Sequence, residues 1–264
     1  MMAYEAALAG LAVPCHGDTI QYGEASDQFG QIWPPAGGGQ HPLAILLHGG
    51  YWRAHYGLDV MNAMAEDLAW FGCAAWNLEY RRVGTPGAGW PDTFEDVISG
   101  FEMIVGLAPI YRLDLKRVVI VGHSAGGQLA LWLAAELARR SGSVRPVAVV
   151  ALAPVADMIE AHRRRLSNDA PAELLGASYS ERPERYVAAS PAALVPLGVR
   201  QLIFHGTEDD SVPHEMSVGY QQAAEAEGDD CELISLPGVG HFELINPRTR
   251  PWGEIRHRIM NALE

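Results

Sequence analysis

Apolar runs of about five or six residues alternate with longer amphipathic segments over most of the chain. The runs predict strands at residues 43–47, 73–78, 117–121, 147–152, 201–205 and 232–236. The amphipathic segments predict helices at residues 58–71, 91–107, 128–139, 213–227 and 252–263. The continuously apolar run 147–152 is typical of a strand covered on both faces. The alternation therefore predicts an α/β fold, with a mostly parallel central sheet and helices on both faces.

Residues 157–197, called the insertion below, interrupt this alternation. They contain three consecutive arginines at 163–165 and scattered prolines, without a regular apolar period. About forty residues are too many for a plain connection between two core strands. We expect the insertion to lie over the carboxyl edge of the sheet as a lid or a wall of a substrate site. Two short surface helices that never touch a ligand are the alternative.

Composition narrows the class of protein. The 264 residues fit one domain, 1–264, and 48% hydrophobic with 19% charged residues is ordinary for a globular protein. A net charge of −13 disfavours nucleic acid and anionic membrane surfaces as partners. Every apolar run is shorter than the ~18 residues of a membrane span. The three cysteines (Cys15, Cys73 and Cys231) lack metal-site spacing and no basic segment opens the chain, so a cytoplasmic, reduced protein is expected.

The residues 122–126, Gly-His-Ser-Ala-Gly, form a G-x-S-x-G motif between a predicted strand and a predicted helix. This is the context that a nucleophile elbow requires. Glycine fits positions 122 and 126, since a side chain there would collide with the neighbouring strand or helix. The motif predicts Ser124 as a nucleophile whose hydroxyl is exposed above the sheet edge. A serine that only shapes the turn is the alternative.

A serine hydroxyl becomes a good nucleophile only when a base takes its proton and an acid orients that base. After such an elbow, the acid and then the histidine follow in chain order. Asp209 lies in the loop after the predicted strand 201–205, and His241 lies in the loop after 232–236. We therefore predict Ser124 as nucleophile, His241 as general base and Asp209 as the orienting acid.

Other residues compete for two of these roles. The competing bases are His205, His214 and His257, and the competing acids are Glu208, Asp210 and Asp157. The first of these histidines ends a predicted strand, which suits a structural role, and only one of three consecutive carboxylates usually points inward. The chain order favours His241 and Asp209.

Acyl transfer also needs hydrogen-bond donors for the oxyanion that forms on the substrate carbonyl. Residues 48–52, His-Gly-Gly-Tyr-Trp, follow the first core strand and are called the HGGYW loop below. Its glycines let backbone N–H groups turn toward a site. We predict the N–H groups of Gly50, Tyr51 and Ala125 as an oxyanion hole, the last at a helix N-terminus. A simple tight turn is the alternative, and His48 is expected to be a scaffold residue.

Several aromatic residues follow predicted strands, on the side of the sheet where ligands bind in such folds. Together with Tyr51, the residues Trp52, Tyr80 and Trp90 are expected to line a substrate pocket. Buried packing is the alternative for each of them taken singly.

Four motifs together resemble the α/β-hydrolase superfamily: HGGYW at 48–52, GHSAGG at 122–127, HGxxDxxVP at 205–213 and GHF at 240–242. Trp52 and the segment Glu-Tyr-Arg-Arg at 79–82 bring the resemblance closer to kynurenine formamidase-like esterases, whose loop reads H-G-G-x-W. The hormone-sensitive-lipase group is also similar, but Tyr51 replaces its third loop glycine and His123 its elbow aspartate. The resemblance implies hydrolysis of N-formyl-kynurenine or small carboxylic esters through an acyl-enzyme, without a metal or cofactor.

The sequence thus predicts a serine hydrolase for a small-molecule ester or formamide, with a homodimer left open. A peptidase of the prolyl-oligopeptidase type is one alternative, although such enzymes generally carry a large extra domain. A binding module built on a hydrolase scaffold is another, although such proteins generally lack one of the three catalytic residues.

Overall fold

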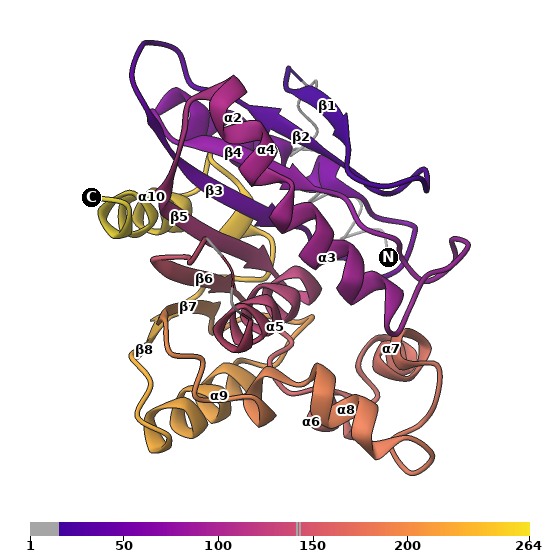
Figure 1. Cartoon of the computed structure of the whole chain (residues 1–264). Helices are drawn as coiled ribbons and strands as arrows, with labels where there is room; N and C mark the ends of the chain where they lie inside the picture. Colours follow the sequence, from indigo (N-terminus) through magenta and orange to yellow (C-terminus); the bar gives the residue numbers. More distant parts are fainter. Residues whose placement is uncertain (1–15, 141, 143) are drawn as a thin grey trace.

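The sheet is the centre of the computed structural model, which describes residues 16–140, 142 and 144–264. Cys15 and the start of the chain, which entered the prediction of location, lie outside the described residues. Within them, eight strands form one sheet in the order β1-β2-β4-β3-β5-β6-β7-β8 (Figure 1). The strands are β1 (Asp18–Gln21), β2 (Phe29–Trp33), β3 (His41–Leu47), β4 (Ala74–Leu78), β5 (Leu113–His123), β6 (Ala148–Leu152), β7 (Arg200–Gly206) and β8 (Cys231–Leu236).

The strands from β4 to β8 pair in parallel, as the sequence predicts. The register pairs Leu47 of β3 with Gly122 of β5, and His123 of β5 with Leu152 of β6. The carboxyl ends of these central strands are therefore level with one another. The loops that follow them meet at one edge of the sheet, which is where ligands bind in open α/β sheets.

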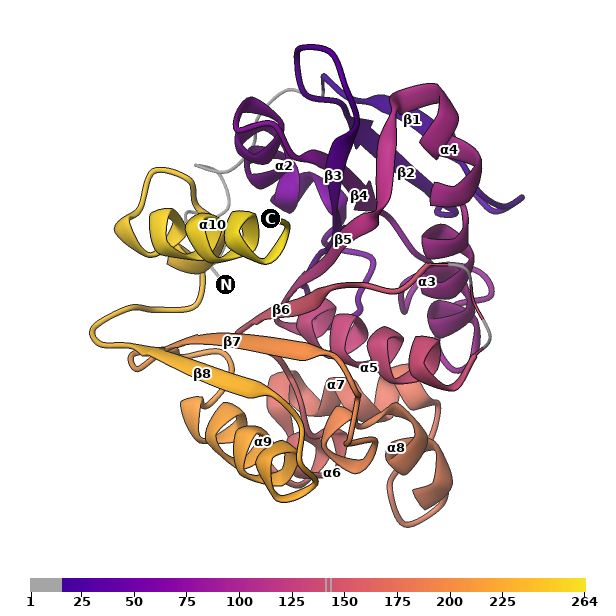
Figure 2. The ribbon, with the colours of Figure 1, turned by 60° about the vertical axis from the view of Figure 1, so that its left-hand side comes forward.

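Helices cover both faces of the sheet (Figure 2). They are η1 (Leu58–Met61), α2 (Asn62–Trp70), α3 (Asp92–Glu102), α4 (Ile104–Tyr111), α5 (Ala125–Arg139), α6 (Met158–Arg163), α7 (Leu166–Leu175), α8 (Pro183–Ala189), η2 (Pro191–Ala193), α9 (His214–Ala226), η3 (Glu243–Ile245) and α10 (Arg250–Ala262). The helices α2 and α10 pack on one face, and α3, α4, α5 and α9 on the other. In the described part of the chain, no helix is both long and apolar enough to cross a bilayer.

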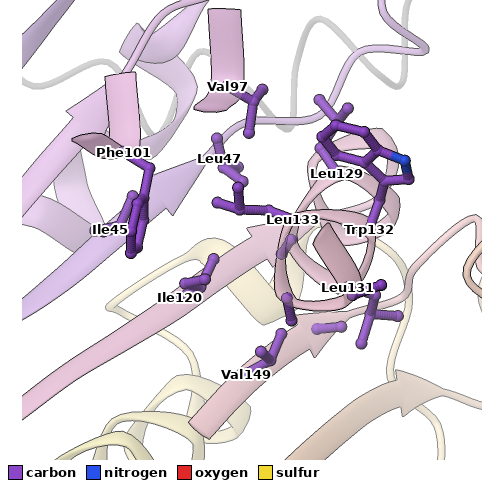
Figure 3. Close-up of a cluster of buried hydrophobic side chains, with 14 of the residues drawn as sticks. Ile45, Leu47, Val97, Phe101, Ile120, Leu129, Leu131, Trp132, Leu133 and Val149 are labelled. Carbon is purple, nitrogen blue, oxygen red and sulfur yellow. The ribbon is translucent and has the colours of Figure 1, made fainter. Parts of the chain in front are cut away.

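The strands are buried because helices cover them on both sides. Every residue of β3, β4 and β6 is buried, which explains their apolar runs. Figure 3 shows Leu129 and Leu133 of α5 gathered with Leu47, Ile120 and Val97. Burying a leucine or isoleucine side chain in this way contributes about 1.5–3 kcal/mol. The core therefore fixes α5, and with it the turn that begins α5.

Several predicted boundaries and elements differ from the structure. The antiparallel hairpin of β1 and β2 was not predicted, because its residues mix polar and apolar positions and are only partly buried. The helix predicted at 91–107 is two helices, α3 and α4, separated at Met103. The strand β5 begins at Leu113 rather than at residue 117. The prediction missed its start because the charged Asp114 and Lys116 interrupt the apolar pattern there.

The insertion contains α6, α7, α8 and η2, which is more helix than the two short helices of the alternative prediction. A left-handed stretch at Ser167, Asn168 and Asp169 interrupts α7. The backbone N–H of Trp90 donates to the carbonyl oxygen of Leu174 at 2.9 Å, so α7 contacts a loop at the carboxyl edge. That the insertion acts as a mobile lid stays a prediction.

The two cysteines within the described residues are buried thiols, as predicted. Cys73 and Cys231 are unpaired. Burial raises the pKa of each thiol to about 12, so both stay protonated near neutral pH.

Candidate active site

The turn between β5 and α5 holds Ser124 in a strained conformation, with φ 57° and ψ −117°. Its backbone N–H donates to the carbonyl oxygen of Leu152 at 2.8 Å, which ties the turn to β6. A Cβ on Gly122 would lie 2.1 Å from the oxygen of Gly126, and one on Gly126 would lie 2.0 Å from the oxygen of Leu47. The elbow therefore needs both glycines. Ser124 is only 2% exposed, in contrast to the expected open position.

The loops after β7 and β8 bring Asp209 and His241 together. Nδ1 of His241 lies 2.6 Å from Oδ2 of Asp209. Because an ionised carboxylate only accepts, Nδ1 of His241 carries the proton and Nε2 is the nitrogen available as a base. A Cβ on Gly206 would lie 2.0 Å from the carbonyl oxygen of Val239, so glycine allows the two loops to approach each other.

His123 connects this pair to the elbow. It directly precedes Ser124, and its ring centroid lies 4.5 Å from that of His241. Nε2–H of His123 donates to the carbonyl oxygen of His241 at 3.1 Å. Burial and the neighbouring His241 hold the pKa of His123 well below its usual value, so this ring stays neutral. The loop that carries the expected base is thus bound directly beside the expected nucleophile.

The competing residues lie in other places. Glu208 and Asp210 are exposed, and the carboxylate of Asp157 accepts from the first amides of α6 as a helix cap. His257 is exposed on α10, and Nε2 of His214 lies 2.8 Å from the hydroxyl of Ser235. None of these contacts reaches Ser124 or His241.

His205 is the contact that the sequence analysis missed. Its Nε2 lies 3.0 Å from the carbonyl oxygen of Val212 and 3.3 Å from Oδ2 of Asp209, so it donates to both. Its Nδ1 accepts from the hydroxyl of Ser217 at 2.7 Å. The sequence does contain a signal for this contact, because His205 and Asp209 are only four residues apart, on either side of a turn.

The charge on Asp209 is well stabilised. Its Oδ1 accepts from the N–H groups of Ser211 and Val212, each at 2.8 Å. Burial opposes ionisation, but hydrogen bonds from His205 and His241 outweigh it and hold the pKa of Asp209 far below its usual range. The carboxylate stays ionised and keeps His241 in the tautomer described above.

The HGGYW loop lies against the elbow. A Cβ on Gly49 would be 3.0 Å from Cβ of Ser124, so the loop backbone and the elbow are in direct contact. Gly50 has φ 113°, and Tyr51 and Trp52 follow in left-handed conformations. The hydroxyl of Tyr51 donates to the carbonyl oxygen of Ser211 at 2.6 Å, which fastens this strained loop to the loop after β7. Ala125 begins α5, where the first N–H groups have no partner within the helix.

Two of the four expected pocket aromatics do not face a ligand space. Trp52 and Tyr80 have no exposed surface. The indole N–H of Trp52 donates to the side-chain oxygen of Gln128, and the hydroxyl of Tyr80 donates to the carbonyl oxygen of His48. Both are packing residues, which corrects that expectation. Trp90 is half-buried against Phe94, and its contact with substrate stays a prediction.

A cavity of about 360 Å³ lies beside the HGGYW loop. Its walls come from this loop and the residues after it, from α7 of the insertion and from the loop after β7. The lining residues are Gly50, Tyr51, Arg53, His55, Tyr56, Ser167, Asn168 and Ser211. Most of them carry polar groups. Across the described residues, no three His, Cys, Asp or Glu side chains are arranged to hold a metal ion.

The family of this chain follows from a comparison with known proteins. The sequence model of the BD-FAE family matches residues 31–223, which is most of the chain and includes the HGGYW loop, the elbow and Asp209. The chain belongs to the BD-FAE family. This is a family of α/β-hydrolase-type esterases. The narrower likeness to kynurenine formamidases stays a prediction.

The individual relatives of this BD-FAE chain have low sequence identity to it. An ethyl acetate hydrolase of Pseudomonas putida is 26% identical over 209 residues, covering 75% of this chain and 64% of that protein. Esterase B of Lactobacillus rhamnosis is similar in structure, with a TM-score of 0.84 and 20% identity over 99% of this chain and 91% of that one. The Est2 esterase of Thermogutta terrifontis with bound propionate has a TM-score of 0.75 and 21% identity, over 95% and 94% of the two chains. These structures establish the α/β-hydrolase fold.

Proposed function

We propose that this chain is a serine hydrolase that cleaves short-acyl carboxylic esters through an acyl-enzyme. The observation that carries the proposal is the 2.6 Å bond between His241 and Asp209, held beside the strained elbow of Ser124 by His123. An ethyl acetate hydrolase among the relatives, and propionate in a neighbour's structure, support a short acyl group.

The proposed steps take Ser124 as nucleophile, His241 as general base and Asp209 as the orienting acid. The hydroxyl of Ser124 attacks the substrate carbonyl carbon while Nε2 of His241 takes its proton. The N–H groups of Gly50, Tyr51 and Ala125 stabilise the oxyanion. His241 then gives the proton to the leaving alcohol, the bond to that alcohol breaks, and the acyl group stays on Ser124. A water molecule, deprotonated by His241, attacks this ester and releases the acid.

The test is a comparison of substrates on purified protein. Specific activity is measured on a graded series of nitrophenyl esters, on N-formyl-kynurenine and on aminoacyl arylamides. We expect acetate to butyrate esters to be cleaved fastest. Faster cleavage of N-formyl-kynurenine would make the protein a formamidase, and faster cleavage of the arylamides would make it a peptidase.

The Ser124→Ala variant tests the nucleophile. We expect the rate to fall by roughly 10⁴ to 10⁶ with unfolding midpoints unchanged, since only a hydroxyl is lost. A fluorophosphonate probe should label the wild type and not this variant. A wild type that takes no label and cleaves none of the substrates would indicate a binding module instead.

A further inference from the structure

His48, the first residue of the HGGYW loop, is held on every side. It has no exposed surface. Its Nε2 lies 2.8 Å from Oε1 of Glu79, and its Nδ1 lies 2.7 Å from the carbonyl oxygen of Gly49. The ring of Tyr80 stacks on it at 4.4 Å with an interplanar angle of 8°. The imidazole therefore has one orientation, with a polar contact at each nitrogen.

The carboxylate of Glu79 meets donors in each contact that the structure shows. It accepts from the N–H groups of Leu58 at 3.0 Å and Tyr80 at 3.1 Å, and Nε of Arg82 lies 3.2 Å away. Burial opposes ionisation, but His48 and then Arg82 outweigh it and hold the pKa of Glu79 below its usual value. The remaining contacts of the carboxylate, with two backbone N–H groups and the Arg82 guanidinium, are all with donors or a positive charge. Glu79 is therefore ionised.

The proton count on His48 follows from its two partners. An ionised carboxylate and a peptide carbonyl can only accept hydrogen bonds. Both ring nitrogens of His48 must then donate, so the ring carries two protons. The sequence predicts only a scaffold role for His48, and Glu79 belongs to the segment 79–82 that carries the family resemblance.

We propose that Glu79 and His48 are a positioning pair, in which a buried imidazolium orients the peptide group that supplies the oxyanion donor at Gly50. In a trans peptide the C=O and N–H groups point in opposite directions. Nδ1–H of His48 holds the carbonyl of Gly49, and so turns the N–H of Gly50 away from the ring. The hydrogen bond also polarises this peptide group, which makes the N–H a stronger donor. The proposal rests on the esterase function proposed above.

The protonation of His48 can be measured without any substrate. ¹⁵N-detected NMR of the imidazole groups in wild-type protein separates a doubly protonated ring from either neutral tautomer. The His48→Asn variant assigns the signal by its loss. We expect His48 to carry protons on both nitrogens at neutral pH. A ring with one unprotonated nitrogen would overturn the proposal, whatever the enzyme hydrolyses.

Kinetics tests the positioning role. Glu79→Gln keeps the shape of the side chain but removes its charge. We expect kcat on nitrophenyl acetate to fall by about 10- to 100-fold with KM within about twofold, somewhat less than the loss of a whole oxyanion donor. Fluorophosphonate labelling of Ser124 should slow by the same factor. His48→Asn should show the same loss, and it replaces Glu79→Gln if that variant does not fold.

Asp96→Asn is the matched control. Asp96 is also a buried carboxylate, paired with Arg81 at 2.7 Å, but it makes no contact with the HGGYW loop. We expect it to lower the unfolding midpoint and leave kcat unchanged. Equal kcat losses in Asp96→Asn and Glu79→Gln would show a merely structural role and reject the pair. A wild type without hydrolysis would reject the proposed function instead, while the NMR result would still stand.

Discussion

Asp209 does more than orient one histidine. Its Oδ2 receives His241 at 2.6 Å and lies 3.3 Å from Nε2 of His205, while its Oδ1 receives two backbone N–H groups. The second histidine contacts the same carboxylate oxygen as His241. An asparagine cannot accept at both positions, because one of them becomes an NH₂ group.

We expect Asp209→Asn to lower kcat by roughly 10⁴, as the loss of the orienting acid does in serine proteases. Facing an amide NH₂ toward two histidine N–H donors leaves buried donors unpaired, which should cost about 1–3 kcal/mol of folding free energy. Steady-state kinetics and urea unfolding measure the two effects. Asp210→Asn, a change to the exposed neighbour, should alter neither. Equal effects of the two variants would show that the acid is misassigned.

The same carboxylate predicts a pH dependence of stability. The pKa of Asp209 is lowered in the folded protein relative to ~3.9 in the unfolded chain. A group of this kind contributes stability that is fully present above about pH 4 and is lost as the pH falls toward the folded value. The difference in unfolding free energy between wild type and Asp209→Asn should therefore shrink as the pH falls from about 4 to about 2. A difference that stays constant over this range contradicts the lowered pKa.

At the scale of elements, the site depends on loops that approach more closely than side chains allow. A Cβ on Gly206 would lie 2.0 Å from the carbonyl oxygen of Val239 and 2.9 Å from that of Gly240. Gly206→Ala must separate the loop of Asp209 from the loop of His241. We expect a loss of about 1–3 kcal/mol in stability, as for other overpacked sites, together with a lower kcat.

Gly219→Ala is the control for this substitution. Gly219 lies within α9, and a Cβ there would meet nothing within 4 Å. Alanine favours helix by about 0.5–1 kcal/mol over glycine, so this variant should be slightly more stable and fully active. If Gly206→Ala behaves like Gly219→Ala, the two loops are not in the close contact described here.

The contact between the insertion and Arg53, the residue after the HGGYW loop, gives a further prediction at this scale. Arg53 makes a two-pronged ion pair with Glu173 of α7, and it donates to the hydroxyl and carbonyl oxygens of Ser167. We expect Arg53→Ala to speed hydrogen exchange of the amides in 166–175, since a partly exposed pair of this kind contributes up to about 1 kcal/mol. Arg163→Ala, whose exposed side chain pairs only with Glu160 of its own helix among the contacts shown, should leave that exchange unchanged.

The sequence predicted best the strands that are buried on two faces. β3, β4, β6 and β7 appear as apolar runs because helices cover them on both sides. The hairpin of β1 and β2 lies at the sheet edge with mixed burial, so its pattern resembles a loop. In the site, chain order was enough to select Asp209 and His241 as partners. It could not show that the left-handed turn at Trp52 rotates this indole into the core, because that depends on Gln128, 76 residues away.

At the scale of the whole molecule, the packed core and the functional residues lie in different parts of the fold. Two hydrophobic layers, one on each face of the sheet, fix the strands and α5. The four loops that hold Ser124, Asp209, His241 and the HGGYW segment all leave the same edge of that sheet. Most of the described non-glycine residues with left-handed φ lie in the HGGYW loop, at the elbow or in the insertion, where the core can hold the strain.

The overall charge predicts how the protein selects among substrates. With a net charge of −13, the surface repels anions, and the one arginine among the cavity-lining residues is already paired with Glu173. We expect KM for an anionic ester to exceed that of a neutral ester of equal size at low salt. The ratio should fall as ionic strength rises from about 0.01 to 0.15 M, since the Debye length shrinks from about 30 to 8 Å. If the anionic ester binds more tightly at low salt, Arg53 must leave Glu173 to meet it, and Arg53→Ala should then abolish that preference.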